Sequence, residues 1–145
     1  MSLHGDYDSQ NIFAKIIRGE APSYKLYEDD DVLAFLDVFP QSYGHTLIIP
    51  KRSAARNLLD VDADALSKMM LTLQKLTRVI TEELQPDGVQ IAQFNGAPAG
   101  QTVFHIHLHI VPRFNGDNLE MHATAKADPA ELEKLQARLV KRING

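Results

Sequence analysis

The sequence has no cysteine, and none of its apolar runs approaches the roughly 18 residues of a membrane-spanning helix. The lack of cysteine excludes disulfides, a thiol nucleophile and a thiolate metal site. The first residues, MSLHGDYDSQ, also lack the apolar core of a signal peptide. We therefore expect a protein of the cytoplasm that has no membrane partner.

An excess of basic residues is missing as well. The 145 residues include 15 Lys and Arg against 19 Asp and Glu, which gives a formal net charge of −4. A protein that binds a nucleic-acid backbone usually carries a basic stripe, so we expect no nucleic-acid partner. Apolar residues make up 44% of the chain and charged residues 23%, as in an ordinary soluble globular protein of one domain.

The most informative stretch of the chain is AGQTVFHIHLHIVPRF, at positions 99–114. In it His105, His107 and His109 alternate with large aliphatic residues, which is the period-2 pattern of a half-buried strand. Successive side chains of a strand point to opposite faces, so the imidazoles share one face. The aliphatic face fits a core, whereas neighbouring imidazoles repel one another if charged and need hydrogen-bond partners if buried.

Three interpretations of the histidine face are open. The histidines could be polar residues on the solvent face of an edge strand. They could belong to a metal site, but the strand advances about 13 Å from His105 to His109. Since Zn–N bonds measure about 2.0–2.1 Å, at most two of the histidines could then share one ion. The third interpretation is catalysis at phosphorus, in which His107 attacks and its neighbours hold charge on the reacting phosphate.

The residues before the histidines favour the third interpretation. Gly100, Gln101 and Thr102 offer an approachable backbone, an amide and a hydroxyl, and these groups suit phosphate oxygens. A neutral histidine is nucleophilic at one ring nitrogen when the other donates its proton to a fixed acceptor, commonly a backbone carbonyl.

This stretch closely resembles the motif of the histidine triad (HIT) superfamily, His-x-His-x-His-x-x with apolar residues at x. The motif here reads HIHLHIV at 105–111, and the preceding GQTV at 100–103 also matches the family pattern. The resemblance extends from Asn11 to Phe114. It implies an α+β fold, with an antiparallel sheet of about five strands and two main helices. It also implies a two-fold homodimer that joins the two sheets into one.

Hydrophobic periodicity and turn residues predict where the elements lie. Helices are expected at 12–17, at 62–85 and from 128 onward, and strands at 24–27, 32–37, 45–49, 89–94 and 103–111. We expect residues 1–10 to be a disordered tail and 11–114 to be the HIT domain. Residues 115–145 are then a C-terminal extension, whose amphipathic helix packs on its own domain or on a partner subunit.

The resemblance implies roles for individual residues. His107 is the nucleophile, and His105, His109 and His45 orient the site and stabilise charge, although His45 alone would read as a structural histidine. Phosphate oxygens are expected to meet Gly100, Gln101 and Thr102, with Asn95 as a further phosphate or water ligand. Asp37 is expected to take both ribose hydroxyls, or else to be a turn residue. The pocket or core residues expected around the nucleoside are Ile12, Phe13, Ile16, Phe35, Leu36 and Val38.

The chain departs from the family at a metal site. Some bacterial relatives hold a structural zinc with two cysteines, a histidine after the third strand and the first triad histidine. The matching positions here are Asn11, Ala14 and Ser53, so three of the four ligands are missing together. We therefore expect no zinc, no other metal and no cofactor.

The resemblance implies a hydrolase that cleaves purine nucleotides at the α-phosphate through a nucleotidyl-histidine intermediate. Its substrate would be a nucleoside phosphoramidate, a dinucleoside polyphosphate or a related nucleotidyl ester. A nucleotide-binding regulatory module with negligible turnover is an alternative, and a metallohydrolase is another. A nucleotidyl transferase is a third, but those relatives usually have glutamine where this chain has His109. Arg113 could meet a distal phosphate, and we expect it to be solvated instead.

Overall fold

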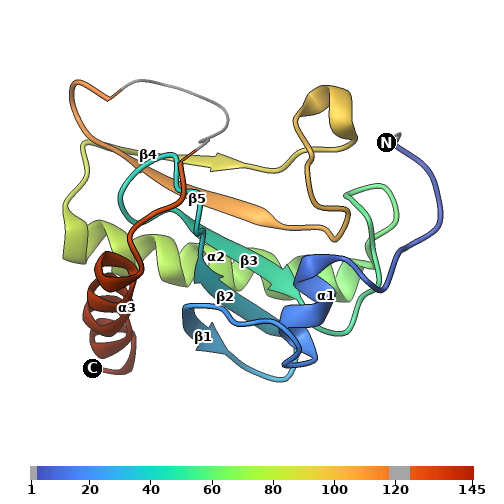
Figure 1. Cartoon of the computed structure of the whole chain (residues 1–145), viewed down its shortest axis with the longest axis horizontal. Helices are drawn as coiled ribbons and strands as arrows, with labels where there is room; N and C mark the ends of the chain where they lie inside the picture. Colours follow the sequence, from blue (N-terminus) through green and yellow to red (C-terminus); the bar gives the residue numbers. More distant parts are fainter. Residues whose placement is uncertain (1–2, 118–124) are drawn as a thin grey trace.

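The computed structural model describes residues 3–117 and 125–145 (Figure 1). Its five strands form one antiparallel sheet in the spatial order β1-β2-β3-β5-β4. The strands are β1 (Lys25–Glu28), β2 (Val32–Leu36), β3 (Thr46–Pro50), β4 (Gly88–Ala92) and β5 (Leu108–Arg113). The predicted α+β fold with a sheet of five strands is therefore confirmed.

Within the described residues, three α-helices and one short 3-10 helix accompany the sheet. They are α1 (Ile12–Ile17), α2 (Ala63–Leu84), η1 (Ala97–Ala99) and α3 (Pro129–Asn144). Each α-helix begins after a polar side chain that accepts a hydrogen bond from a first-turn amide, and these capping residues are Asn11, Asp62 and Asp128. The helix starts predicted at 12, 62 and 128 are confirmed to within one residue.

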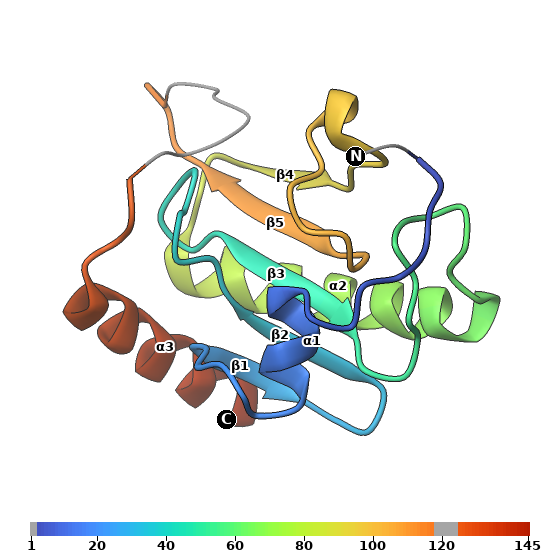
Figure 2. The same ribbon diagram turned by 45° about the vertical axis from the view of Figure 1, so that its right-hand side comes forward.

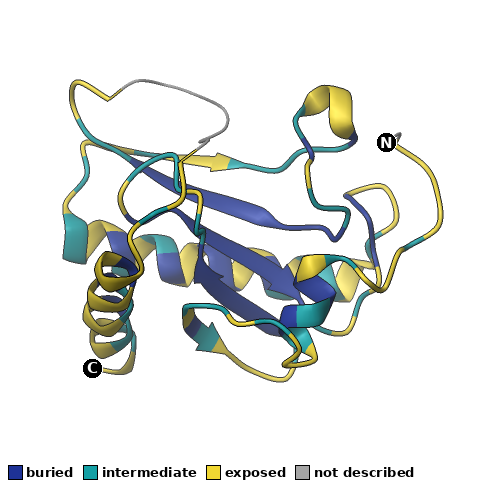
Figure 3. Cartoon of the chain, viewed as in Figure 1, coloured by how far each residue is buried: buried dark blue, intermediate teal, exposed yellow. Residues whose placement is uncertain are grey.

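Helices cover both faces of the central strands, as the two views show (Figures 1 and 2). On one face, Ala34 and Leu36 of β2 belong to a core cluster that includes residues of α2 and α3. On the other face, Leu33 and Phe35 pack with Phe13 of α1. All five residues of β2 are therefore buried, which explains why VLAFL reads as a continuous apolar run (Figure 3).

The histidine-bearing segment is only partly a strand, which differs from the expected strand at 103–111. Pairing with β3 runs from Thr46 opposite Ile110 to Ile48 opposite Leu108. Before Leu108 the chain leaves the sheet, because the Ile106 amide donates to the Ala55 carbonyl at 2.9 Å instead of to a strand. The alternation survives this departure: Ile106 is buried in the α2-side core, and the three histidines face the α1 side.

The C-terminal helix belongs to the body of the domain. Leu132, Leu135 and Leu139 of α3 are buried in the same core cluster as α2, and Arg138 donates to Glu83 at 2.7 Å. Helix α3 therefore packs on its own chain, which is one of the two arrangements expected for it. Positions 118–124, which were assigned to the extension, lie outside the described residues.

The N-terminal segment, for which the sequence predicts disorder, contacts the body of the protein within residues 3–10. Asn57 donates to the Leu3 carbonyl at 2.9 Å, and Arg56 donates to the Asp6 carbonyl at 3.1 Å. The composition of residues 3–10 could not predict these contacts, because the acceptors are backbone carbonyls, which every residue carries. Residues 1–2 of the expected tail lie outside the described part of the chain.

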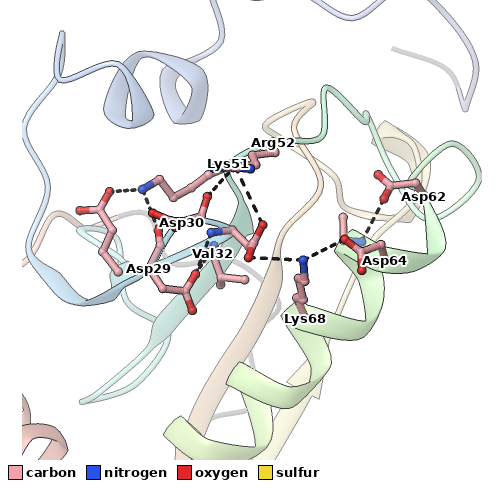
Figure 4. A network of polar contacts seen from close by, with 11 residues as sticks. Asp29, Asp30, Val32, Lys51, Arg52, Asp62, Asp64 and Lys68 are labelled. Atoms are coloured by element: carbon pink, nitrogen blue, oxygen red, sulfur yellow. Dashed lines mark hydrogen bonds and ion pairs between the residues drawn. The ribbon is translucent and has the colours of Figure 1, made fainter.

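Charged side chains join the β1–β2 turn to the end of β3 and to the start of α2 (Figure 4). Lys68 lies 3.4 Å from Asp31 and 2.9 Å from Asp64, and Lys51 lies 2.7 Å from Glu28. Exposed pairs of this kind contribute little individually to stability. Lysines from the end of β3 and from α2 thus pair with the acidic β1–β2 turn. None of the acidic residues of this turn lines the cavity described below.

Candidate active site

A cavity of about 720 Å³ opens on the α1 side of the sheet. Its walls come from α1, from β2 and the loop after it, from the segment before β5 and from the start of α3. Most of the lining is apolar, and Asp37, His45 and His109 form a close polar group within it. The residues expected around a nucleoside all line it, namely Ile12, Phe13, Ile16, Phe35, Leu36, Asp37 and Val38.

His107 lines this cavity with one ring nitrogen already committed. Its Nδ1 lies 2.8 Å from the His105 carbonyl oxygen, and a carbonyl can only accept, so Nδ1 carries the proton. The ring packs against the edge of Phe13, with 4.9 Å between ring centroids. Burial lowers the pKa of His107 to about 4, with the His105 carbonyl bond acting in the opposite direction. At neutral pH the ring is therefore uncharged, and Nε2 holds a lone pair.

Hydrogen bonds also fix the ring protons of His45 and His109. The Gln41 amide donates to His45 Nδ1 at 3.0 Å, so the proton of neutral His45 is on Nε2. That nitrogen lies 3.0 Å from His109 Nδ1, which must then accept, and His109 carries its own proton on Nε2. The His109 ring also lies beside His107, with 4.8 Å between the ring centroids. The site therefore places an imidazole N–H donor next to an imidazole nucleophile.

Asp37 lies at the same end of the cavity. One carboxylate oxygen accepts from the Phe39 amide at 2.8 Å, and the other lies 3.5 Å from His45 Nε2. Burial raises the pKa of Asp37 to about 6, whereas burial, followed by the charge of Arg113, lowers the pKa of His45 to about 3. The contact between Asp37 and His45 is accordingly not an ion pair, because the lone pair on His45 Nδ1 is already used by Gln41. Asp37 is ionised at neutral pH and accessible from the cavity.

A family model for the HIT domain matches residues 18–116 of the chain. The protein belongs to the HIT family. A HIT-like protein of Bartonella henselae, whose crystal structure is known, is 43% identical, with 95% of this chain and 99% of that chain covered and a TM-score of 0.89. A hypothetical histidine triad nucleotide-binding protein of Sulfolobus tokodaii is 32% identical, with 91% of each chain covered and a TM-score of 0.82. The adenylylsulfatase HINT3 of Arabidopsis thaliana is 38% identical over 129 residues, which are 89% of this chain and 65% of that protein.

The positions that match the zinc ligands of some HIT relatives have other functions here. The Asn11 side chain accepts a hydrogen bond from the Ala14 amide at 2.9 Å, so these two positions together form the N-terminal cap of α1. Ser53 hydrogen-bonds the side chain of Asp62, which caps α2. An amide, a methyl group and a hydroxyl do not form a zinc-binding set. These residues do not fit the metal of those relatives.

Asp37, His45 and His109 have ligand-type atoms within 4.8 Å of one another, and no other such group occurs in residues 3–117 and 125–145. Ligation through His45 Nε2 would need the ring proton on Nδ1. The Gln41 amide already donates to Nδ1, so the proton cannot be there without loss of that bond. The arrangement therefore fits a hydrogen-bonded relay better than a metal site.

The expected phosphate ligands divide into two sets. Gly100 and Thr102 line the cavity, and Gly100 has a φ of 106°, which a residue with a side chain would rarely adopt. Gln101 is buried away from the cavity, where it accepts from the Gly96 amide at 2.8 Å and donates to the carbonyls of Arg56 and Val103. Its amide is thus fully used in holding the loop that carries Gly100 and Thr102.

Asn95 is also placed away from the cavity. Its side-chain oxygen accepts from the Leu58 amide and from Gln93, each at 2.9 Å. Arg113, which we expected to be solvated, donates to Gln41 and to Gln90. Arg113 therefore holds the peptide segment whose amide fixes the His45 proton.

Sequence reasoning missed several residues at the site, of which two sets bear on its chemistry. The first is the start of the C-terminal helix and the segment before it, from which Lys126, Ala127 and Leu132 line the cavity. The second is Tyr7, whose hydroxyl lies 2.5 Å from His105 Nδ1. A single tyrosine in a polar tail carries no periodic signal. Leu47 also lines the cavity and was not predicted. Alternation within β3 could have identified it, because Leu47 packs with Leu33 and Phe35 on the α1 face.

Proposed function

We propose that this HIT protein is a hydrolase that cleaves purine nucleotides at the α-phosphate through a nucleotidyl-histidine intermediate. One observation carries the proposal: the His107 ring has its Nδ1 proton bound by the His105 carbonyl at 2.8 Å and is held uncharged at the cavity wall. The names of the Sulfolobus and Arabidopsis relatives, one nucleotide-binding and one an adenylylsulfatase, support a nucleotide substrate and hydrolysis.

In the first step, His107 Nε2 forms a bond to the α-phosphorus as the bond from phosphorus to the leaving group breaks. The leaving group takes the electron pair, and the imidazole that now carries the nucleotidyl group becomes positively charged. The His105 carbonyl accepts a hydrogen bond from His107 Nδ1–H throughout the step and so stabilises the positive charge. The proton on His109 Nε2 provides a donor next to the reacting phosphate, where negative charge develops.

In the second step, water attacks the same phosphorus, the N–P bond breaks and the electron pair returns to His107 Nε2. The proton that the attacking water loses balances the one that the departed leaving group takes up, so His107 ends neutral as it began. Gly100 and Thr102 supply a close backbone and a hydroxyl to the phosphate oxygens at the cavity wall. His45 acts through His109, because it accepts from Gln41 and donates to His109 Nδ1. No step requires a group other than the substrate, water and these side chains.

Recognition of the nucleoside is proposed for the apolar end of the cavity. Phe13 and Phe35 meet edge to face with 5.4 Å between centroids, which gives an aromatic wall suited to a purine. Asp37 also lines the cavity, 3.5 Å from His45 Nε2, with an ionised carboxylate that suits the ribose hydroxyls. Arg113 and Asn95 are proposed to support the site without touching the substrate.

The wider setting of the protein follows the same resemblance. No helix in the described residues is long and apolar enough to cross a membrane. We propose that the protein acts in the cytoplasm as a homodimer, without a nucleic-acid partner and without zinc or another cofactor. The substrate is proposed to be a nucleoside phosphoramidate, a dinucleoside polyphosphate or a related nucleotidyl ester.

The test is a comparison of kcat/KM for adenosine 5′-phosphoramidate, adenylyl sulfate and diadenosine polyphosphates, with wild type and His107→Ala. We expect wild type to hydrolyse at least one of them, and His107→Ala to lose turnover while nucleotide affinity stays within a few-fold. His105→Ala and His109→Ala should be impaired without being inactive, and His4→Ala, at an exposed histidine, serves as the matched control.

The alternatives give different results in the same assay. Nucleotide binding without turnover by wild type would indicate a regulatory module. Transfer of the nucleotidyl group to an acceptor other than water would indicate a transferase. Loss of activity in a chelator would indicate a metallohydrolase. Loss of a general base alone lowers the rate by about 10²–10⁴-fold and leaves measurable activity. A measurable residual rate in His107→Ala would therefore indicate that His107 is a general base and not the nucleophile.

Asp37→Asn tests the recognition half of the proposal. We expect weaker binding of ribonucleotides and little change for 2′-deoxy analogues, because the charged acceptor of the ribose hydroxyls is lost. Hydrogen bonds to charged groups contribute about 1.5–3 kcal/mol, so the affinity for ribonucleotides should fall roughly ten- to a hundredfold. Titration of both sugars by calorimetry measures this. Equal losses for the two sugars would return Asp37 to a turn-forming role.

A further inference from the structure

The N-terminal segment brings a tyrosine to the first histidine of the triad, 98 positions away in the sequence. The Tyr7 hydroxyl lies 2.5 Å from His105 Nδ1, and the two rings meet edge to face with 5.7 Å between centroids. Tyr7 is half-buried, although its neighbours in the sequence are exposed. Figure 2 shows the segment running from the N-terminus past the 51–62 loop to the start of α1.

The proton positions on His105 give this contact a direction. His105 Nε2 lies 3.0 Å from the Pro50 carbonyl oxygen, which can only accept, so the ring proton is on Nε2. Burial lowers the pKa of His105, so the ring is neutral and Nδ1 holds a lone pair. The Tyr7 hydroxyl is therefore the donor, and both nitrogens of His105 are satisfied.

His105 in turn presents the acceptor that activates His107. The backbone carbonyl of His105 accepts a hydrogen bond from His107 Nδ1–H, with 2.8 Å between nitrogen and oxygen. This stretch of chain is not held by strand pairing, because β5 begins only at Leu108. Its position depends on the Ile106 amide bond to Ala55 and on the two bonds of the His105 ring.

We propose that Tyr7 is a positioning residue, which locks the His105 ring and thereby holds the His105 carbonyl in place for the nucleophile His107. The proposal rests on the proposed function for its catalytic meaning. His105 does not line the cavity, whereas His107 and His109 do. Tyr7 thus acts on the site through His105, without lining the cavity, and the N-terminal segment contributes to catalysis by positioning that histidine.

Attachment of the segment does not depend on the Tyr7 hydroxyl. Asn57 and Arg56 bind the carbonyls of Leu3 and Asp6, and Asn11 caps the helix that follows. Tyr7→Phe should therefore leave the segment docked, keep the ring contact and remove one hydrogen bond. Tyr27→Phe is the matched control, because it removes a tyrosine hydroxyl bonded to Asp29 at 2.8 Å on the exposed surface.

The experiment combines steady-state kinetics with nitrogen NMR of the imidazoles in the full-length protein. In Tyr7→Phe we expect kcat to fall about five- to tenfold, the loss of one ordinary hydrogen bond, with KM within about twofold. The His105 Nδ1 resonance should move toward that of a nitrogen without a hydrogen-bond donor, and the His107 nitrogen resonances should shift with it. Tyr27→Phe should match wild type in both readings.

The proposal is overturned if kcat and the His105 and His107 resonances of Tyr7→Phe equal those of Tyr27→Phe. It is also overturned if KM alone changes, because that result would place Tyr7 in substrate binding. The NMR reading needs no turnover. Wild type that hydrolyses none of the substrates, together with coupled shifts of His105 and His107 in Tyr7→Phe, would refute the proposed function and retain the positioning role.

Discussion

Two carbonyl oxygens and one backbone amide determine where each histidine of the site carries its proton. The carbonyls of Pro50 and His105 can only accept, and the Gln41 amide can only donate. These three backbone groups assign a single tautomer to all four histidines without reference to substrate. The result is one nucleophilic nitrogen on His107 and one N–H donor on His109, the two groups that attack at phosphorus requires.

The same burial makes the stability of the protein depend on pH. Below the ordinary histidine pKa of 6.5, the unfolded chain protonates His45 and His107, whose folded pKa values are about 3 and about 4. Asp37 acts in the opposite direction, since its folded pKa of about 6 lies above its ordinary 3.8. Between pH 4 and pH 6 the unfolded state therefore gains two protons on these histidines and lacks the one on Asp37.

We predict that the free energy of unfolding falls as the pH is lowered through this window, by about 1.4 kcal/mol per pH unit from these three groups. Asp37→Asn removes the opposing contribution, so the slope should steepen by about 1.4 kcal/mol per pH unit. Urea denaturation of both proteins at several pH values between 4 and 6 measures the difference. Parallel slopes would mean that burial does not raise the Asp37 pKa.

At the scale of elements, the sequence predicts well whatever depends on local pattern. The period-2 alternation correctly separates the histidines from Ile106, Leu108 and Ile110, which lie in the α2-side core. Hydrophobic periodicity and turn residues likewise predict the helix starts to within one residue. The strand boundary at Leu108 could not be predicted, because it depends on the long-range bond from Ile106 to Ala55.

The candidate site shows the same limit. Gln101 and Thr102 are adjacent and equally polar. Only the fold shows that Thr102 lines the cavity, whereas the Gln101 amide is hydrogen-bonded to the backbone of Gly96 and Arg56. Tyr7 could not have been found either, because its partner His105 lies 98 positions away in the sequence. Periodicity reports which face a residue takes and says nothing about its long-range partner.

The start of helix α1 carries a prediction about zinc. Asn11 and Ala14 are used in the helix cap, where some HIT relatives have zinc-binding cysteines. We expect no stoichiometric zinc after gentle purification, because the site has no thiolates. Elemental analysis by mass spectrometry measures this, with metal-free buffer as the blank. About one zinc per chain would contradict the prediction and revive a metal role for the histidines.

The whole molecule has an exposed sheet edge that bears on its assembly. Strand β4 pairs with β5 on one side and is the last strand of the sheet on the other. Ile91 on this strand is 45% exposed, and Leu71 on α2 is 69% exposed. An unpaired edge with exposed apolar side chains favours pairing with another chain. The apolar face of α3, by contrast, is covered within its own chain and gives no support to a dimer.

We predict that the protein is a homodimer in solution, joined through the β4 edge. Light scattering at micromolar concentration should give a mass near twice the 16.2 kDa of the chain. Ile91→Lys, which places a charge on that edge, should shift the mass toward the monomer, and Leu3→Lys at an exposed site of the N-terminal segment is the control. A wild-type mass near 16.2 kDa would count against the dimer.

The central claim is that His107 forms a covalent bond to phosphorus, and rapid quench with a substrate labelled at the α-phosphate tests it most directly. Wild type mixed with excess substrate should trap label on the protein within the first turnover. The label should be labile in acid and stable in alkali, as a phosphorus–nitrogen bond requires, and it should map to His107. His107→Ala should trap none. Active wild type that traps no label at any quench time, with His107→Ala retaining a few per cent of its rate, would contradict the account and favour direct attack by water.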